Sequence, residues 1–270
     1  GKKYAFRNDG RMIDGLKFIY EDKDAQSLTV WADDDDPYRF DSEDDFDDNA
    51  PLYEAAGYYC YYFGNGDDGA MRTNKTTVEI DGENFNFYFE KSGGKKGAGL
   101  TGEKDDKFYQ SGKLLKADTD DKYSVVQRQL VKKTNGAIND TLDVVTTKDS
   151  TTTEVYKVLD DVDELLTVAK DAADVDILTI DDLNSMEKGK ADSILKAANI
   201  NKDLEDLREV YIFGKDENGN FKASELDTKD YFLVNTSGKV LDSKGRHKDG
   251  SDYYYALTSG GKIAGIYVED

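Results

Sequence analysis

Short stretches of alternating aromatic and polar residues recur along the chain, and each is followed by a polar turn and a glycine. In the first stretch, Tyr4 and Phe6 are two positions apart, the turn ends at Gly10, and Met12 is again apolar. Side chains two positions apart lie on one face of a β-strand. A segment such as NDG permits the positive φ angle of a tight turn. The pattern therefore predicts a β-hairpin with one aromatic face.

The same pattern occurs in eight copies, numbered 1 to 8 in chain order, at 4–12, 61–71, 87–102, 108–115, 123–138, 211–221, 231–240 and 253–265. A two-stranded hairpin is only marginally stable by itself. We therefore expect successive hairpins to pack on one another through their aromatic faces, as units of a repeat protein do. The sequence predicts a mainly β fold, built as a β-hairpin repeat solenoid.

The periodicity changes near residue 150. Apolar residues between Val155 and Ala169 recur at steps of three and four, which predicts an amphipathic helix. Thr151 and Glu154 would form its capping box. A strand through the segment VYKVL that becomes helical near Asp160 is the alternative.

Further helical signals follow in the same region. A second capping box, Thr179 with Asp182, predicts a helix that continues through Met186, and further turns are expected at 191–198 and 204–210. Together the patterns give hairpin repeats at 1–149 with an acidic insertion at 31–57, an inserted small α-helical subdomain at 150–209, and hairpin repeats at 210–270. The expected fold is α+β overall.

Composition restricts the partners. The chain has 270 residues and a net charge of −21, which argues against nucleic acid and against anionic lipid as ligands. No apolar run is long enough for a transmembrane helix, so we expect no membrane insertion. The single cysteine, Cys60, excludes an intrachain disulfide and is expected to be a buried apolar filler.

Two acidic segments raise the possibility of calcium, although we predict no cofactor. Aspartate and glutamate crowd the stretch from Asp33 to Asp48, which is either a calcium site or a solvated insertion between hairpins. The segment GKDENGNFKASE, at 214–225, matches several ligand positions of an EF-hand loop. Its first position is Gly214 where a carboxylate is needed, and the hairpin pattern explains the same residues.

The residues for catalysis are scarce, and we predict that the chain is not an enzyme. The single histidine, His247, lies in the charged segment KGRHKDG and is expected to be an exposed loop residue. A nucleophile that is activated by a base would need a histidine, and this loop residue is the one histidine in the chain. No glycine-rich phosphate loop follows a strand and opens a helix, and no pair of the numerous carboxylates stands out as an acid and base.

The segments KKYAFRNDGRMIDGL, YYFGNGDDGAM and NFYFEKSGGKKGAGLTG resemble the Gram-positive cell-wall-binding repeats, a group that includes choline-binding modules, glucan-binding repeats and the C-terminal repeats of large clostridial toxins. The resemblance covers about 1–138 and 209–268. It implies a hairpin solenoid, an extracellular location at the cell surface or cell wall, and binding of wall polymer or carbohydrate. Because the chain opens in mid-pattern with GKKYAF, we expect it to belong to a longer protein.

Aromatic rings are the expected ligand-binding groups, because the CH groups of a sugar lie against a ring face. Choline is not the expected ligand, since the positions that carry tryptophan in choline-binding repeats hold other residues here. The candidate residues are Trp31, Tyr58, Tyr59, Tyr62, Tyr88, Tyr109, Tyr253 and Tyr254. The alternative is a structural or adhesive stalk, or a region of a larger surface protein that binds host glycan or protein. The sequence leaves the oligomeric state open.

Overall fold

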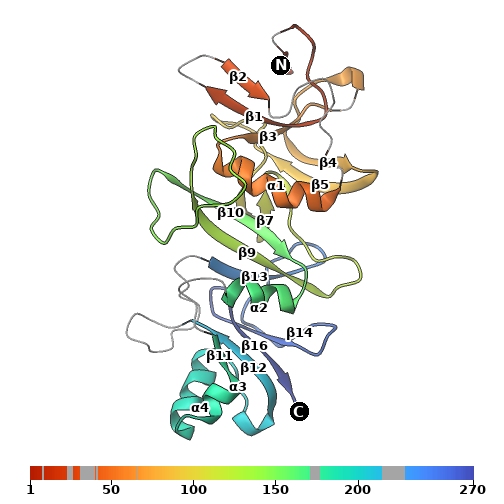
Figure 1. The fold of residues 1–270 in the computed structure, drawn as a ribbon. Helices are drawn as coiled ribbons and strands as arrows, with labels where there is room; N and C mark the ends of the chain where they lie inside the picture. The colour runs from red at the N-terminus through yellow and green to blue at the C-terminus, as the bar shows by residue number, and fades with distance from the viewer. Residues whose placement is uncertain are drawn as a thin grey trace. The chain divides into compact units, whose positions relative to one another are not determined.

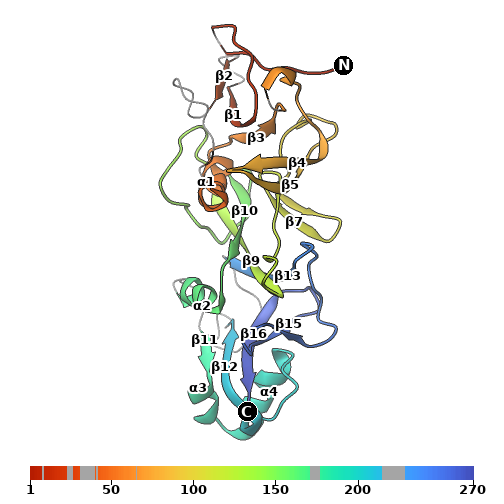
Figure 2. The same cartoon turned by 90° about the vertical axis from the view of Figure 1, so that its right-hand side faces the viewer.

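The computed structural model describes residues 1–7, 9–22, 27–30, 40, 42–64, 66–170, 177–214 and 229–270 (Figures 1 and 2). The chain divides into two compact units. Unit 1 comprises Gly1–Leu115, Leu130–Val144 and Lys148–Lys157, and unit 2 comprises Lys116–Gln129, Val145–Thr147 and Val158–Asp270. The boundaries expected from the repeat pattern divide the chain differently and remain a prediction.

The described residues confirm a mainly β fold, with four antiparallel sheets and few helices. Unit 1 holds two of these sheets. One has the order β2-β1-β3, formed by β1 (Leu16–Asp22), β2 (Ser27–Val30) and β3 (Tyr59–Tyr62). The other has the order β4-β5-β8-β7-β6, formed by β4 (Asn74–Ile80), β5 (Glu83–Phe89), β6 (Gly102–Lys104), β7 (Lys107–Gln110) and β8 (Lys113–Leu114).

Unit 2 holds a five-stranded sheet of order β11-β12-β16-β15-β14, formed by β11 (Ile177–Thr179), β12 (Leu207–Phe213), β14 (His247–Lys248), β15 (Tyr254–Leu257) and β16 (Ile263–Glu269). The fourth sheet, β10-β9-β13, is formed by β9 (Tyr123–Lys132), β10 (Thr152–Leu159) and β13 (Lys229–Asn235). The chain passes from one unit to the other within β9 and again within β10. Within unit 2, β13 pairs with the first part of β9, from Tyr123 to Gln129.

The acidic segment of unit 1 forms a helix, α1 (Glu43–Ala55), from residue 43 onward. Ser42 caps it, because its Oγ accepts a hydrogen bond from the backbone N–H of Asp45 at 3.1 Å. The acidic first turn suits the positive end of the helix dipole. Phe46 and Tyr53 of this helix are buried, and Phe46 packs edge-on against Phe87. The helix lies beside β5 (Figure 1). This part of the predicted insertion is therefore a core element, and not a solvated loop.

Both faces of the five-stranded sheet of unit 2 are covered by helices. Tyr255 and Ile266 point to the face packed against α2 (Val162–Lys170), whereas Tyr254 and Tyr267 point to the other. That second face is covered by α3 (Ile180–Asn184) and α4 (Lys188–Ala197), and α3 lies beside β12 in both views (Figures 1 and 2). β16 accordingly has six successive buried residues, from Ile263 to Val268, as expected for a strand covered on both faces.

The predicted helix at 155–169 is replaced by β10 followed by α2, which is the alternative interpretation of that segment. Thr151 does not cap a helix, because its backbone N–H and its hydroxyl donate to the Asp149 carboxylate in a turn, both at 2.7 Å. The helices predicted at Thr179 and near residue 191 are present as α3 and α4, and Thr179 forms the predicted capping box with Asp182. The short helix η2 (Leu204–Asp206) precedes β12.

Five copies of the repeat form antiparallel hairpins in one register. In each, a residue of the first arm pairs with the residue two positions after the turn glycine, here called the plus-two residue. The pairs are Phe6 with Met12, Phe89 with Gly99, Tyr109 with Leu114, Val234 with Val240, and Leu257 with Ile263. The turn glycines all have positive φ, for example +84° at Gly10 and +90° at Gly97, which favours glycine there.

The other three copies differ. In copy 2 the arms are joined by the backbone hydrogen bond from Arg72 to Tyr62 at 2.7 Å, and its turn contains the short helix η1 (Gly66–Asp68). Copy 5 is not a hairpin as predicted, because Gly136 donates its N–H to the Ala56 carbonyl at 2.7 Å and β9 pairs with Val144 instead. The turn of copy 6 lies outside the described residues.

The turn glycine of one copy faces the plus-two residue of the copy before it. A Cβ on Gly69 would overlap the Met12 thioether, and a Cβ on Gly97 would overlap that of Met71.

The same relation holds at two further junctions. A Cβ on Gly112 would lie 3.0 Å from Phe87 Cδ1 and 3.1 Å from the Gly99 Cα. One on Gly261 would lie 3.0 Å from the Leu241 carbonyl oxygen and 3.9 Å, an ordinary contact distance, from Val240 Cγ1. Copies 1 to 4 in unit 1 and copies 7 and 8 in unit 2 therefore share one packing rule.

Backbone contacts accompany this packing. The N–H of Met71 in copy 2 donates to Lys3 at 2.8 Å, and the N–H of Gly99 in copy 3 donates to Cys60 at 2.6 Å. In unit 2, Phe232 of copy 7 forms an antiparallel bridge with Lys262 of copy 8. In each case the second arm of one copy contacts the first arm of the copy before it or the residue that directly precedes that arm.

Candidate functional site

Four of the eight candidate aromatic residues are buried. Tyr58, Tyr62, Tyr88 and Tyr109 have exposed fractions between 4% and 8%. The Tyr62 ring stacks on Phe89 with centroids 6.3 Å apart, and the rings of Tyr88 and Tyr109 pack on each other at 6.0 Å. A ring buried in this way has little free face for a sugar, so the visible role of these four is packing.

Tyr59, Tyr253 and Tyr254 are half-buried, and Trp31 lies outside the described residues. Tyr59 carries the Lys95 ammonium 4.4 Å above its ring. Tyr253 is oriented by a hydrogen bond from its hydroxyl to the Glu209 carboxylate at 3.3 Å. Ligand binding by all eight residues remains a prediction, and among those that the structure describes only Tyr59, Tyr253 and Tyr254 are partly exposed.

Tyr254 lies at the centre of a row across three strands. It pairs with Lys248 of β14 on one side and with Tyr267 of β16 on the other. The rings of Tyr254 and Tyr267 stack with centroids 5.2 Å apart and an interplanar angle of 15°. The Arg246 guanidinium carbon lies 4.4 Å from the Tyr254 ring centroid, and the Lys248 ammonium lies 5.3 Å from it. We call Tyr254, Tyr267, Arg246 and Lys248 the Tyr254 platform.

One carboxylate anchors the cations beside this platform. Glu269 pairs with Arg246 and, at 2.8 Å, with Lys202, and both cations contact the same oxygen, Oε1. The hydrogen bond from Lys202 holds the pKa of the Glu269 carboxyl below its usual value, and the hydrogen bonds to Glu269 raise the pKa of Lys202 and of Arg246. Two cations on one carboxylate leave a surplus of positive charge here.

Sequence reasoning named Tyr254 but missed Arg246, Lys248 and Tyr267. The segment RHK, 246–248, was the sequence signal that could have revealed the two cations, and its Lys248 stands six positions before Tyr254. It was interpreted as part of a charged loop. In the structure His247 and Lys248 form β14, and His247 is buried, with Nε2 2.9 Å from the Asp242 carbonyl oxygen. The prediction of an exposed loop histidine is therefore wrong, because β14 pairs with β15 and turns the ring inward.

A second polar cluster is buried in unit 1 around Glu54. The Ser111 hydroxyl donates to the Glu54 carboxylate at 3.4 Å, and Gln110 Nε2 donates to Ser111 at 2.9 Å. Burial raises the pKa of the Glu54 carboxyl to about 7. Burial likewise raises the pKa of the Cys60 thiol, which keeps it in the unreactive protonated form. Cys60 is fully buried, as the sequence predicts.

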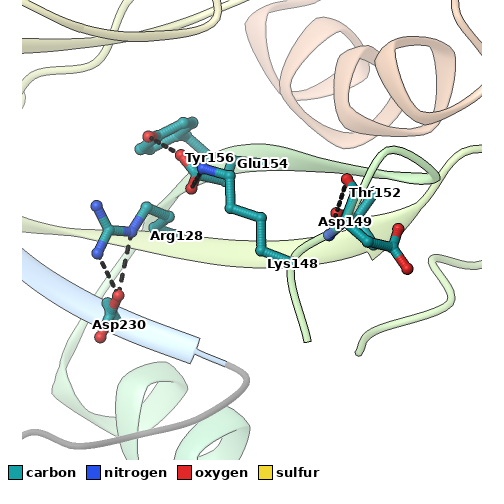
Figure 3. A network of polar contacts seen from close by, with 7 residues as sticks. All are labelled: Arg128, Lys148, Asp149, Thr152, Glu154, Tyr156 and Asp230. Atoms are coloured by element: carbon teal, nitrogen blue, oxygen red, sulfur yellow. Dashed lines mark hydrogen bonds and ion pairs between the residues drawn. The ribbon is translucent and has the colours of Figure 1, made fainter. Parts of the chain in front are cut away.

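Figure 3 shows further carboxylates held by partners within each unit. In unit 1, Glu154 accepts hydrogen bonds from Lys148 at 2.8 Å and from the Tyr156 hydroxyl at 3.2 Å. In unit 2, Asp230 accepts a hydrogen bond from Arg128, its cross-strand partner, and lies 2.8 Å from Lys262. The pair of Arg128 and Asp230 joins β9 to β13, which is a structural role.

Among the described residues, no group of three or more His, Cys, Asp or Glu side chains is arranged to hold a metal ion. The segments 31–39 and 215–225, on which the calcium hypothesis mainly rests, lie outside the described residues. Within the described ranges, no helix has both the length and the hydropathy needed to cross a bilayer.

Comparison with known proteins gave no match: no family model, no curated protein and no solved structure is significantly similar to this chain.

Proposed function

We propose that the chain is a non-catalytic binding module of an extracellular surface, built as a β-hairpin repeat solenoid with an inserted helical subdomain, which recognises cell-wall polymer or carbohydrate. The observation that carries the proposal is the shared packing rule, in which the turn glycine of one copy faces the plus-two residue of the copy before it. Each of the eight degenerate copies is weak evidence for a repeat family when it is taken alone. The common register of copies 1, 3, 4, 7 and 8, and the packing shared by these copies and copy 2, support one repeat family.

The half-buried tyrosines supply the binding surface in this proposal. Tyr59 and Tyr254 each lie beside cationic side chains, and aromatic rings with nearby polar groups suit a saccharide, whose CH groups pack on a ring while its hydroxyls form hydrogen bonds. The negative net charge of the chain favours a neutral glycan, or a contact confined to locally cationic patches.

The test is co-sedimentation of the purified chain with purified Gram-positive cell wall, followed by a glycan array. We expect the chain to pellet with the wall and to bind a defined set of glycans. Tyr254→Ala and Tyr59→Ala should each weaken retention, whereas Tyr4→Ala, a change at an exposed tyrosine that is not a candidate binding residue, should not. A chain that stays in the supernatant and binds no glycan would contradict the proposal.

A structural or adhesive stalk is the second candidate, and the burial of Tyr58, Tyr62, Tyr88 and Tyr109 favours it. In that case the aromatic residues of the repeats hold the array together, and a host glycan or protein binds elsewhere on a larger surface protein. Indifference to cell wall, together with retention by host-cell surface, would select the stalk over the wall-binding module.

A further inference from the structure

The cations of the Tyr254 platform are notable on a chain whose net charge is −21. Lys202, Arg246 and Lys248 gather around one pair of stacked rings, and the carboxylates in direct contact with them are Glu269 and Asp252. An anionic ligand is repelled over most of such a surface, so a local excess of positive charge is where it can be held.

Arg246 has unused hydrogen-bonding capacity. Its side chain is 55% exposed and donates to Glu269 and to the Tyr267 hydroxyl. A guanidinium carries five N–H donors in a planar fork that matches an oxyanion. The guanidinium lies over the Tyr254 ring, so an oxyanion that accepts from its remaining donors is held beside this tyrosine.

Lys248 extends the same surface along β14. Its ammonium lies 2.8 Å from Asp252, whose side chain is 68% exposed. A pair this exposed contributes little to stability and exchanges readily with another anion. A ligand oxyanion can therefore compete with Asp252 for Lys248 while it accepts hydrogen bonds from Arg246.

We propose that the Tyr254 platform binds a saccharide that carries an oxyanion, with Arg246 and Lys248 holding the oxyanion and Tyr254 contacting the sugar. The inference rests on the proposed carbohydrate-binding function and names the class of sugar. It also explains how a strongly acidic module takes an anionic polymer without a bridging metal.

The experiment measures the affinity of the chain, by calorimetry or by NMR titration, for trigalacturonate, for its neutral methyl ester and for inorganic phosphate. We expect trigalacturonate to bind more tightly than the other two, with an affinity that falls as salt is raised, because the contact is ionic and exposed. Arg246→Gln should weaken binding by about tenfold or more, since a hydrogen bond to a charged group is lost.

Matched variants separate the site from folding and from general charge. Lys248→Gln removes a cation from an exposed pair and should weaken binding with little change in melting temperature. Lys190→Gln removes a cation from the exposed side of α4 and should leave binding unchanged. Arg246→Lys keeps the charge without the planar fork and should be intermediate.

Several outcomes would overturn the inference. They are equal affinity for the methyl ester, equal affinity for free phosphate, and full affinity in both Arg246→Gln and Lys248→Gln. Retention of neutral wall glycan without binding of trigalacturonate would remove this inference and leave the proposed function standing. Failure to bind any glycan, neutral or anionic, would remove both.

Discussion

The turn glycines differ in what lies beyond their missing side chains. Gly10 and Gly97 have almost the same φ, +84° and +90°. A Cβ on Gly10 would meet open space, whereas one on Gly97 would overlap Met71. Comparing the two positions separates the cost of backbone conformation from the cost of packing.

We expect Gly97→Ala to destabilise the fold more than Gly10→Ala. Both changes place a Cβ in the left-handed region, which costs about 1–2 kcal/mol. At Gly97 the new methyl group must also displace the Met71 side chain, and overpacking of this kind typically adds about 1–3 kcal/mol. Urea denaturation of the two variants measures the difference.

Met71→Ala provides the control for this comparison. If the extra cost arises at the contact, the double variant Gly97→Ala, Met71→Ala should show a coupling free energy of about 0.5–3 kcal/mol. Equal destabilisation by Gly10→Ala and Gly97→Ala, with no coupling to Met71, would show that the glycine does not pack as described.

The buried Glu54 carboxyl should make stability depend on pH. Its pKa is raised from 4.5 to about 7, so between these values the folded chain binds more protons than the unfolded chain. Stability from this group is then full below about pH 4.5 and falls as pH rises toward 7, by roughly 3 kcal/mol for a shift of this size. Glu54→Gln should remove this fall, as measured by urea denaturation at pH 5 and pH 8.

Two controls accompany that measurement. Glu79→Gln, at an exposed position, should keep the pH dependence of the parent chain. Asp47, whose pKa burial raises to about 6, titrates in the same window and remains in both variants. An unchanged pH slope in Glu54→Gln would mean that Glu54 does not titrate in this range.

Among the elements, α1 is joined to the sheet by one buried lysine. Lys113 of β8 is 3% exposed and contacts two α1 carboxylates, Glu43 and, at 2.6 Å, Asp47. Its ammonium also lies 5.0 Å from the Phe85 ring centroid. The lysine thus compensates the charge of the acidic helix at the place where that helix enters the core.

Lys113→Met should destabilise unit 1 strongly, by about 3–5 kcal/mol, because the Asp47 carboxylate then stays buried without its cation. Chemical denaturation monitored by tyrosine fluorescence measures the loss. Adding Asp47→Asn to that variant should recover part of it, since the uncompensated charge is gone. A single variant as stable as the parent would show that α1 does not depend on the pair.

The hairpins were predictable because their signal is local. Alternating aromatic residues define the first arm, and a glycine with positive φ defines the turn, so Gly10, Gly97 and Gly238 were identified from sequence alone. Copy 5 shows the limit of this reasoning. Its turn has the right residues, but a Cβ on Gly136 would lie 3.3 Å from the Tyr20 ring, and the Gly136 N–H donates to the Ala56 carbonyl at the end of α1. Sequence spacing does not reveal these contacts.

The β10 segment shows a second limit. Its buried residues are Thr152, Val155, Tyr156 and Leu159, whose spacing of three, one and three matches the face of a helix. A strand buried on both sides produces this pattern when each side is covered only in part. Its β-branched and aromatic residues were the better guide.

The candidate site was predictable only in its aromatic part. Tyr254 belongs to the repeat pattern, whereas Arg246 and Lys248 reach it through the pairing of β14 with β15. Sheet pairing of a two-residue strand leaves almost no trace in sequence.

The helix α1 was hidden for another reason, because its acidic face outweighs Phe46 and Tyr53 in composition.

The whole chain carries 57 acidic residues against 36 basic ones, and this excess should oppose folding through self-repulsion. Raising NaCl from about 0.05 to about 0.5 M shortens the screening length to less than 10 Å and should raise the melting temperature by a few degrees. Near pH 4.4, the isoelectric point, the same salt increment should have much less effect. A melting temperature that falls with salt at pH 7 would show that attractive ion pairs dominate.

The contact between a turn glycine and the preceding plus-two residue has an evolutionary consequence. Copies 1, 2, 4, 7 and 8 each contain a turn glycine and a larger plus-two residue, whereas the plus-two residue of copy 3 is Gly99. A copy gained by gene duplication would therefore pack against both of its neighbours through the same contact. If a copy were deleted, the two copies beside it could still pack against each other. The other turn residues can change as long as a large plus-two residue in one copy faces a glycine in the next. The copies can therefore diverge widely in sequence and still pack together.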